Sequence, residues 1–415
     1  MNISIQEINK ASELLKGIVH KTPLQYSKRL SKKYNADIYI KREDLQEVRS
    51  FKIRGAYNKI ASLTDEEKKR GVVTASAGNH AQGVAYACSA LKIKGVIFMP
   101  ATTPRQKVEK VQYFGDTFVE IQLTGDTFDA SKITAETYCK EHNAIFVHPF
   151  NDPLVIAGQG TVAHEFYNDL DGKVDVVVVP IGGGGLISGV ASYIKQSNSK
   201  IKVIGAEPDG AAEMLEARKA GKVVTLDKID TFADGVAVKT AGDLTFLLCE
   251  KYVDDIISVP EGKICTEMIE LYQKDGIIAE PAGAVSITAL DSIKHEIKGK
   301  TVVCILSGGN NDISRYAEII ERSLLYKGLK HYFIVEFAQK PGQLRAFLHD
   351  CLGPDDDITL FEYYKRNNKE KGPALVGIEL KYKDDLYPLL ERLEKIGINI
   401  RKITPDDLSY HLLVS

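Results

Sequence analysis

A run of apolar strands between helical segments constrains the fold of this chain more than any other feature. Residues 174–180, VDVVVVP, are apolar at nearly every consecutive position instead of alternating with polar residues. Such continuity is typical of parallel strands buried on both faces. Further short β-rich segments alternate with helical apolar periods, at residues 71–76, 94–100, 117–123, 144–150, 201–208, 254–260 and 301–308. The pattern predicts an α/β structure with helices covering its sheets.

The pattern changes after about residue 325, where the order of predicted elements becomes βαββαβ. This order is that of a ferredoxin-like unit, here of about 85 residues. The expected strands are 331–337, 357–367, 374–382 and 398–403, and the expected helices are 341–352 and 384–397. Residues 326–330, YKGLK, are the expected hinge. Two domains are therefore predicted, at residues 1–325 and 326–415.

Composition and charge exclude several classes of partner. The chain has 54 Lys and Arg against 56 Asp and Glu, so it lacks the basic field that nucleic acid requires. No apolar run approaches the ~18 residues of a membrane span, and the first 15 residues predict an amphipathic helix rather than a signal peptide. Six cysteines without a C-x-x-C pair favour a reducing compartment. We therefore expect a cytoplasmic protein that binds neither nucleic acid nor membrane.

A lysine stands in the first turn of a predicted helix in SFKIRGAYNKI, residues 50–60. Apolar residues recur there at the spacing of one buried helical stripe, at Ile53, Ala56, Tyr57 and Ile60. Ser50 is the expected N-cap. The positive end of the helix dipole disfavours the ammonium form of Lys52, which makes this amine a candidate to lose its proton. The alternative is an amphipathic lysine that extends its amine to solvent.

Two loops between a predicted strand and a predicted helix are candidate anion sites. In SAGNHAQG, residues 76–83, Gly78 allows a close turn, Ser76 is a candidate cap, and the free amides of the helix start suit a carboxylate. An ordinary capped turn is the alternative. In PIGGGGLISG, residues 180–189, four consecutive glycines let successive amides wrap a phosphate.

The kind of phosphate is left open by these residues. Glu207 ends the next strand, 22 residues after Gly185, as a ribose-binding acid would in a dinucleotide fold. No G-x-G-x-x-G register fits, which weakens the nucleotide interpretation. Ser307, in LSGGN at the end of the last α/β strand, offers a neutral hydroxyl where open sheets bind ligands, or is a turn serine. A phosphate cradle, a carboxylate site, a poised amine and a neutral hydroxyl are together the parts that hold pyridoxal phosphate and an amino acid.

With these motifs in this order, the chain resembles the fold-type II pyridoxal-phosphate enzymes and, within them, the threonine dehydratases (threonine ammonia-lyases). The resemblance covers essentially residues 5–410 and rests on SFKIRGA, SAGNHAQG, GGGGL, EPAGA and SGGN. It implies a tryptophan synthase β-like catalytic body of two subdomains, the smaller inserted at about residues 44–144. It also implies that Lys52 forms the Schiff base next to Phe51, that Asn79 contacts the ring hydroxyl and that Ser307 faces the pyridine nitrogen. The implied phosphate cradle is Gly182, Gly183, Gly184, Gly185 and Leu186, and the implied substrate-carboxylate site is Ser76, Gly78, Asn79 and His80.

The C-terminal unit resembles the ACT-like regulatory domain of biosynthetic threonine dehydratases, through FAQKPGQLRAFL, GPDDDITLFEYYKR and GPALVGIEL. The resemblance implies β-elimination and deamination of L-threonine to 2-oxobutanoate and ammonia, with L-serine as a second substrate. Isoleucine is the expected effector, valine a second candidate, and a homotetramer the expected assembly. Longer members have two such units and this chain has length for one. The alternatives are a serine dehydratase or racemase, a nucleotide-dependent α/β protein and a non-catalytic amino-acid sensor.

Three acidic residues have open roles in the sequence. Glu280, in EPAGA, is either a second carboxylate at the site or a helix-start anion, and the helix start is favoured. Glu207 and Glu213, with Ala211, resemble the cation site of related racemases, but solvated surface acids are the favoured interpretation. No metal ligand is therefore predicted.

Overall fold

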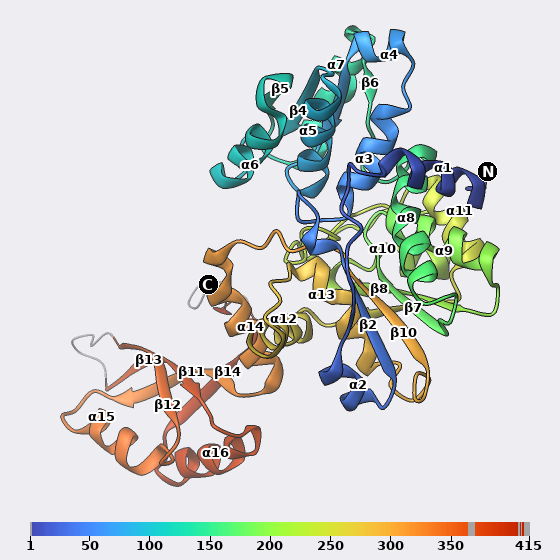
Figure 1. The fold of residues 1–415 in the computed structure, drawn as a ribbon. Coiled ribbons are helices and arrows are strands. Elements are labelled where there is room, and N and C mark those ends of the chain that lie inside the picture. The colour runs from blue at the N-terminus through green and yellow to red at the C-terminus, as the bar shows by residue number, and fades with distance from the viewer. Residues whose placement is uncertain (1, 364–369, 406, 408, 411–415) are drawn as a thin grey trace. The chain divides into compact units, whose positions relative to one another are not determined.

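The computed structural model describes residues 2–363, 370–405, 407, 409 and 410, and its chain divides into two compact units (Figure 1). The first unit is Met1–Ile313 and the second is Ser314–Ser415. The helix α14, Tyr316–Lys327, thus falls in the second unit, although the sequence placed the domain boundary at residue 325. Each unit has its own hydrophobic core.

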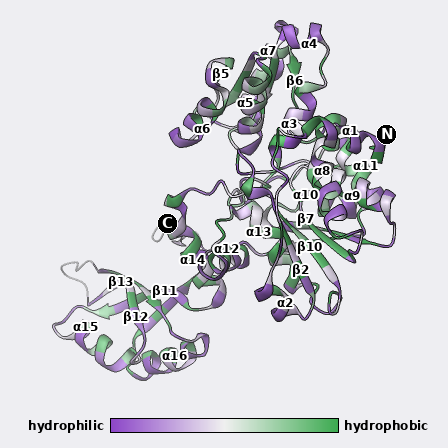
Figure 2. Ribbon diagram, in the orientation of Figure 1, coloured by the Kyte–Doolittle hydropathy of each residue, from purple (hydrophilic) through white to green (hydrophobic). Residues whose placement is uncertain are grey.

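The larger sheet of the first unit has six strands in the order β1-β2-β10-β7-β8-β9. Its strands are β1 (Leu24–Tyr26), β2 (Asp37–Arg42), β7 (Val176–Pro180), β8 (Lys202–Pro208), β9 (Asp255–Val259) and β10 (Thr301–Leu306). Only the β1–β2 pair is antiparallel. Every residue of β7 is buried, and Figure 2 shows its ribbon apolar along its length, as the consecutive valines predict. Helices α1 (Ile5–Leu15), α8 (Pro153–Asp169), α9 (Gly185–Ser197), α12 (Glu261–Asp275) and α13 (Pro281–Thr288) belong to this body.

The smaller sheet has four parallel strands in the order β5-β4-β3-β6. Its strands are β3 (Val72–Ala75), β4 (Gly95–Met99), β5 (Val119–Leu123) and β6 (Ile145–Phe146), with helices α3 (Lys52–Ala61), α4 (Asp65–Arg70), α5 (Asn79–Leu91), α6 (Arg105–Gly115) and α7 (Phe128–Glu141). All eight α/β strands expected from the sequence are present. The edge strand β1 and its neighbour β2 were not predicted.

Glycines bring α3 into backbone contact with helices on both sides. A Cβ on Gly83 of α5 would lie 3.0 Å from the carbonyl oxygen of Lys52, and one on Gly158 of α8 would lie 2.6 Å from that of Arg54. Arg54 is fully buried and pairs with Glu43 at 2.8 Å and Glu165 at 2.6 Å. The start of α3 is therefore held by close packing and by buried ion pairs.

The second unit has a four-stranded sheet in the order β12-β13-β11-β14 with antiparallel pairing throughout. The strands are β11 (Lys330–Ala338), β12 (Asp357–Tyr363), β13 (Lys371–Glu379) and β14 (Asn399–Ile403), and the helices are α15 (Gln343–Ala346), a π-turn at Phe347–Cys351, and α16 (Leu386–Lys395). This arrangement confirms the ferredoxin-like prediction. Residues 364–367 of the expected second strand lie outside the described residues.

Candidate functional site

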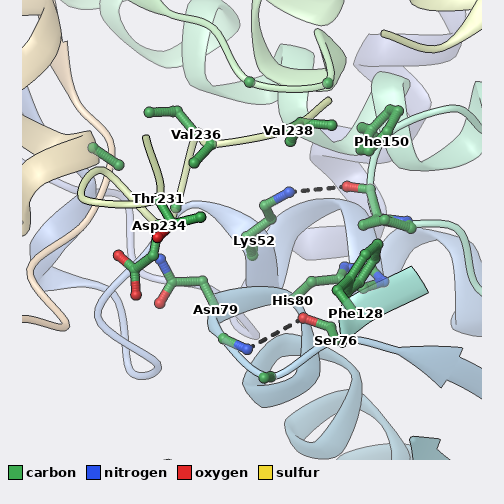
Figure 3. A pocket seen from close by; sticks show the side chains of 18 of the residues that line it. Lys52, Ser76, Asn79, His80, Phe128, Phe150, Thr231, Asp234, Val236 and Val238 are labelled. Carbon is green, nitrogen blue, oxygen red and sulfur yellow. Dashed lines mark hydrogen bonds between the residues drawn. The ribbon is translucent and has the colours of Figure 1, made fainter. Parts of the chain in front are cut away.

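The residues singled out in the four loops line one cavity of about 870 Å³ in the first unit (Figure 3). Its wall contains Phe51, Lys52, Ser76, Gly78, Asn79, His80, Gly182, Gly183, Gly184, Gly185, Leu186 and Ser307. The volume is within the usual range for small-molecule and cofactor sites. Loops far apart in the chain therefore meet at a single site.

Lys52 is the first residue of α3, and its amine points into the cavity (Figure 3). Burial lowers the pKa of Lys52 to about 8, although the charge of Glu280 opposes this shift. The Nζ atom donates to the carbonyl oxygen of Pro149 at 3.0 Å. The predicted loss of basicity is thus confirmed, with burial as its main cause.

The expected N-cap at Ser50 is wrong. Phe51 occupies the cap position, and its side chain makes no capping hydrogen bond. Ser50 instead forms an isolated β-bridge with Gly308, which follows β10. That bridge ties the loop before α3 to the loop that carries Ser307, a long-range contact that local sequence cannot reveal.

The glycine loop between β7 and α9 packs its backbone closely against Phe150. A Cβ on Gly183 would lie 2.4 Å from the ring of Phe150, and one on Gly185 would lie 2.9 Å from Cβ of Phe150. Gly184 has a φ of +86°, a conformation that other residues rarely adopt. The amides at the start of α9 suit an anion, so the loop fits a phosphate group.

The loop before α5 differs in detail from the expectation. Gly78 is the cap residue, and Ser76 accepts a hydrogen bond from the Gly78 amide at 3.3 Å instead of capping the helix. The His80 ring is buried and bonds through Nε2 to the carbonyl oxygen of Val147 at 3.0 Å. Burial lowers the pKa of His80 to about 3, so its side chain is neutral and offers no charge to a carboxylate. The main-chain amides remain as the donors of this loop.

Glu280 stands at a helix start, as favoured from the sequence, and it is also a carboxyl group of the cavity. It occupies the N-cap position of α13 without a capping bond, and Oε1 accepts from Nδ2 of Asn79 at 2.7 Å. Burial, with a smaller contribution from Asp234, raises the pKa of Glu280 to about 7. On its other side Asn79 accepts from Nδ2 of Asn310 at 2.7 Å. Asn310, the last residue of SGGN, was quoted in the motif but given no role.

The remaining wall was not predicted. It includes Phe150 and several residues of the segment 221–242, among them Thr231, Val236 and Val238 (Figure 3). That segment contains no helix or strand, so its sequence carries no periodic signal. Asp234 in this segment pairs with Lys107 of α6 at 2.7 Å.

Ser307 follows β10 and is buried in the cavity wall. Its hydroxyl donates to the carbonyl oxygen of Ala282 at 3.3 Å. As predicted, a neutral hydroxyl stands at this strand end.

Glu207 and Glu213 are buried, so the interpretation as surface acids is wrong. The Glu207 carboxyl accepts hydrogen bonds from the amides of Met214 and Leu215, each at 2.9 Å. Burial raises the pKa of both groups, and their mutual proximity raises that of Glu213 further. Among the described residues, no group of three or more histidine, cysteine or acidic side chains is arranged to hold a metal ion.

Comparison with known proteins agrees with this geometry. Residues 15–308 match the family model for pyridoxal-phosphate dependent enzymes, and residues 321–413 match the C-terminal regulatory domain of threonine dehydratase. The chain is 56% identical to the L-threonine dehydratase biosynthetic IlvA of Halalkalibacterium halodurans, over 99% of each chain. It is 55% identical to the protein of the same name from Bacillus subtilis, over 99% of this chain and 98% of the relative.

Solved structures give the same result. A threonine deaminase isoform 2 from Solanum lycopersicum superposes with a TM-score of 0.74 and 39% identity, over 77% of this chain and 87% of that one. A maize serine racemase gives a TM-score of 0.72 and 34% identity, over 79% of this chain and 99% of that one.

The fold and the site define a pyridoxal-phosphate dependent enzyme of the two-subdomain α/β type. The alternative of a nucleotide-dependent protein is thereby excluded. Within this class, the chain belongs to the threonine dehydratase family. No helix in the described part of the chain is long and apolar enough to cross a bilayer.

Proposed function

We propose that this chain is a threonine ammonia-lyase that converts L-threonine to 2-oxobutanoate and ammonia, the first committed step of isoleucine biosynthesis. The observation that carries the proposal is the meeting of a buried amine, a bare-backbone phosphate loop and a neutral hydroxyl in one cavity. The names of the relatives that match over the full chain support the same reaction.

The cavity residues would divide the work of holding pyridoxal phosphate. Lys52 would carry the covalent link, and Asn79 and Ser307 would contact the ring. The phosphate would lie against the backbone of Gly182, Gly183, Gly184, Gly185 and Leu186. When bound, the cofactor withdraws electrons from the substrate and so makes its Cα proton acidic.

Lys52 would then act as the general base. An amine with a pKa of about 8 is neutral in an appreciable fraction of molecules near neutral pH, and it accepts a proton effectively under those conditions. Once the substrate's amine has taken its place, the freed Nζ would take the Cα proton and deliver it to the β-hydroxyl, which departs as water when the Cβ–O bond breaks. The resulting enamine reacts with water to give 2-oxobutanoate and ammonia. The main-chain amides of residues 76–80 would hold the substrate carboxylate at the positive end of α5.

The test uses the purified full chain with pyridoxal phosphate. We expect a near-visible absorbance band that changes on addition of L-threonine, together with formation of 2-oxobutanoate. The same assay with L-serine measures pyruvate, and chiral analysis measures D-serine, because the likeness to serine racemase makes racemisation the second candidate activity. A protein that binds the cofactor but forms no 2-oxobutanoate would refute the proposal.

The second unit would bind isoleucine and couple that binding to the catalytic unit as a feedback inhibitor, with valine as a competing effector. The match of residues 321–413 to a regulatory domain supports an effector role. Such coupling requires that isoleucine bind the inactive arrangement more tightly than the active one. We further propose a homotetramer located in the cytoplasm, which gel filtration with light scattering and cell fractionation would test.

A further inference from the structure

Three side chains of the cavity wall form a hydrogen-bonded row with a defined direction. Nδ2 of Asn310 donates to Oδ1 of Asn79, and Nδ2 of Asn79 donates to Oε1 of Glu280, each over 2.7 Å. Glu280, which precedes α13, is 4% exposed; Asn79 is the first residue of α5, and Asn310 lies in the loop after β10. The threonine dehydratase reaction as derived above uses Asn79 but gives Glu280 no part.

The direction of this row is fixed at its Asn310 end. Nδ2 of Asn310 faces the carbonyl oxygen of Val48 at 2.8 Å, which can only accept. Oδ1 of Asn310 faces the amine of Lys110 at 3.4 Å, which as an ammonium can only donate. Because a flipped amide would lose both contacts, Asn310 presents an N–H to Asn79. The oxygen of Asn79 is thereby engaged.

The amide nitrogen of Asn79 therefore donates to groups other than Asn310. It has two hydrogens, and Glu280 accepts one of them. The second hydrogen remains for the cavity that Asn79 lines together with Lys52. A hydrogen bond to a carboxylate is stronger than one to a neutral acceptor, so Glu280 holds the Asn79 amide more firmly than a neutral side chain would.

We propose that Glu280 is a positioning residue, which fixes the amide of Asn79 so that one N–H is directed at the bound cofactor's ring oxygen. The inference rests on the proposed function, because it requires that Asn79 contact the cofactor. Glu280 does not touch the reacting atoms in this proposal and acts through Asn79.

Burial, together with the charged groups around Glu280, brings the pKa of this carboxyl near neutral pH. Lys52 of α3 and Lys107 and Lys110 of α6 are basic, and Asp234 of the 221–242 segment is acidic. Burial and Asp234 together raise the pKa of Glu280 to about 7, while Asn79 and Lys107 oppose the shift. As pH falls through about 7 the carboxylate takes up a proton, and its bond to Asn79 weakens.

The experiment titrates the full-length apoprotein with pyridoxal phosphate and measures affinity at pH 6 and pH 8. Glu280→Leu removes the acceptor and is expected to weaken affinity about tenfold or more, the effect of losing a hydrogen bond to a charged group. Glu280→Gln keeps an acceptor oxygen without charge, so we expect it to restore most of the affinity. It is also expected to gain less affinity between pH 6 and pH 8 than the unmodified protein does, and to keep only the part of that gain that comes from deprotonation of Lys52. Glu261→Leu is the matched control, because Glu261 is a part-buried carboxyl outside the cavity that accepts the Gly210 amide.

Asn79→Ala separates this inference from the proposed function. If Glu280 acts through Asn79, Glu280→Leu adds nothing to Asn79→Ala in the double variant. A direct effect of the carboxylate on Lys52 would persist in the Asn79→Ala background and would overturn the inference. So would a Glu280→Gln variant that keeps the pH dependence of the unmodified protein, a readout that remains if Glu280→Leu does not fold. Should Asn79→Ala alone leave affinity unchanged, the cofactor contact of Asn79 in the proposed function is refuted as well.

Discussion

The amine of Lys52 donates to the main-chain carbonyl of Pro149, 3.0 Å away. A carbonyl accepts from an ammonium group and from a neutral amine alike, so the contact fixes the position of Nζ without binding its proton as a carboxylate would. The charge of Glu280 opposes the loss of that proton, and the pKa of Glu280 is itself raised. The site therefore holds an amine that is both fixed in place and easily deprotonated.

Replacement of this amine should abolish most of the turnover. Lys52→Ala removes the general base, whose contribution is about 100-fold to 10,000-fold, and also the covalent link to the cofactor. We expect at least a 100-fold loss of kcat with L-threonine and an unchanged melting temperature. Lys69→Ala, on exposed α4, is the control. Normal turnover by Lys52→Ala would refute the assigned role.

The pH dependence of cofactor attachment reports the pKa of Lys52 directly. Only the neutral amine attacks the aldehyde of pyridoxal phosphate, so the rate should rise with pH and level off above about 8. With a lysine of unshifted pKa, the rate would continue to rise until about pH 10. Stopped-flow absorbance on the full-length apoprotein measures the rate. A plateau only near the unshifted value would contradict the lowered pKa.

A methyl group on the phosphate loop should impair cofactor binding. Gly183→Ala places its Cβ 2.4 Å from the Phe150 ring, so the ring or the loop must move. We expect pyridoxal phosphate affinity to fall at least about tenfold, a change of about 1.4 kcal/mol. Equilibrium titration tests this. The double variant with Phe150→Ala should lose less than the sum of its single variants, because removal of the ring relieves the clash.

The buried ion pairs of Arg54 should matter for stability. Arg54→Met leaves Glu43 fully buried without its partner, and breaking such a pair typically costs about 3–5 kcal/mol. Urea denaturation measures the loss in the free energy of unfolding, from the transition that belongs to the first unit. Arg105→Ala is the control. It breaks the ion pair between Arg105, whose side chain is 92% exposed, and Glu109, and it should leave the unfolding midpoint unchanged. Equal effects of the two substitutions would contradict this account.

Regulation should depend on the second unit. We expect isoleucine to lower activity of the full chain and to raise its melting temperature. A chain truncated after Ile313 should lose both responses while keeping cofactor binding. If the truncated protein shows the same thermal shift with isoleucine, the effector site lies in the first unit.

The parts of this fold that depend on local pattern could be predicted, and those that depend on distant contacts could not. The consecutive valines of β7 predict a buried strand, and the glycine run after it predicts an anion-binding loop. Both predictions need only the local sequence. By contrast, Ser50 has a side chain suited to an N-cap, but it pairs with Gly308 in a β-bridge and does not cap α3. Glu280 stands at a helix start, as expected, but its hydrogen bond with Asn79, 201 residues away in the chain, could not be inferred from the local sequence. The sequence of segment 221–242 has no periodicity, so its position in the cavity wall could not be inferred.

The close packing of α3 sets limits for anyone who wishes to redesign this enzyme. At Gly83 and Gly158 an added methyl group would crowd the carbonyls of Lys52 and Arg54. Helix α3 and these two glycines should therefore be kept unchanged in a redesign. Side chains such as Thr231 and Val238 project into the cavity from a segment without regular structure. Libraries aimed at new β-substituted amino acids should therefore vary the 221–242 segment and leave α3 and its two glycine contacts unchanged.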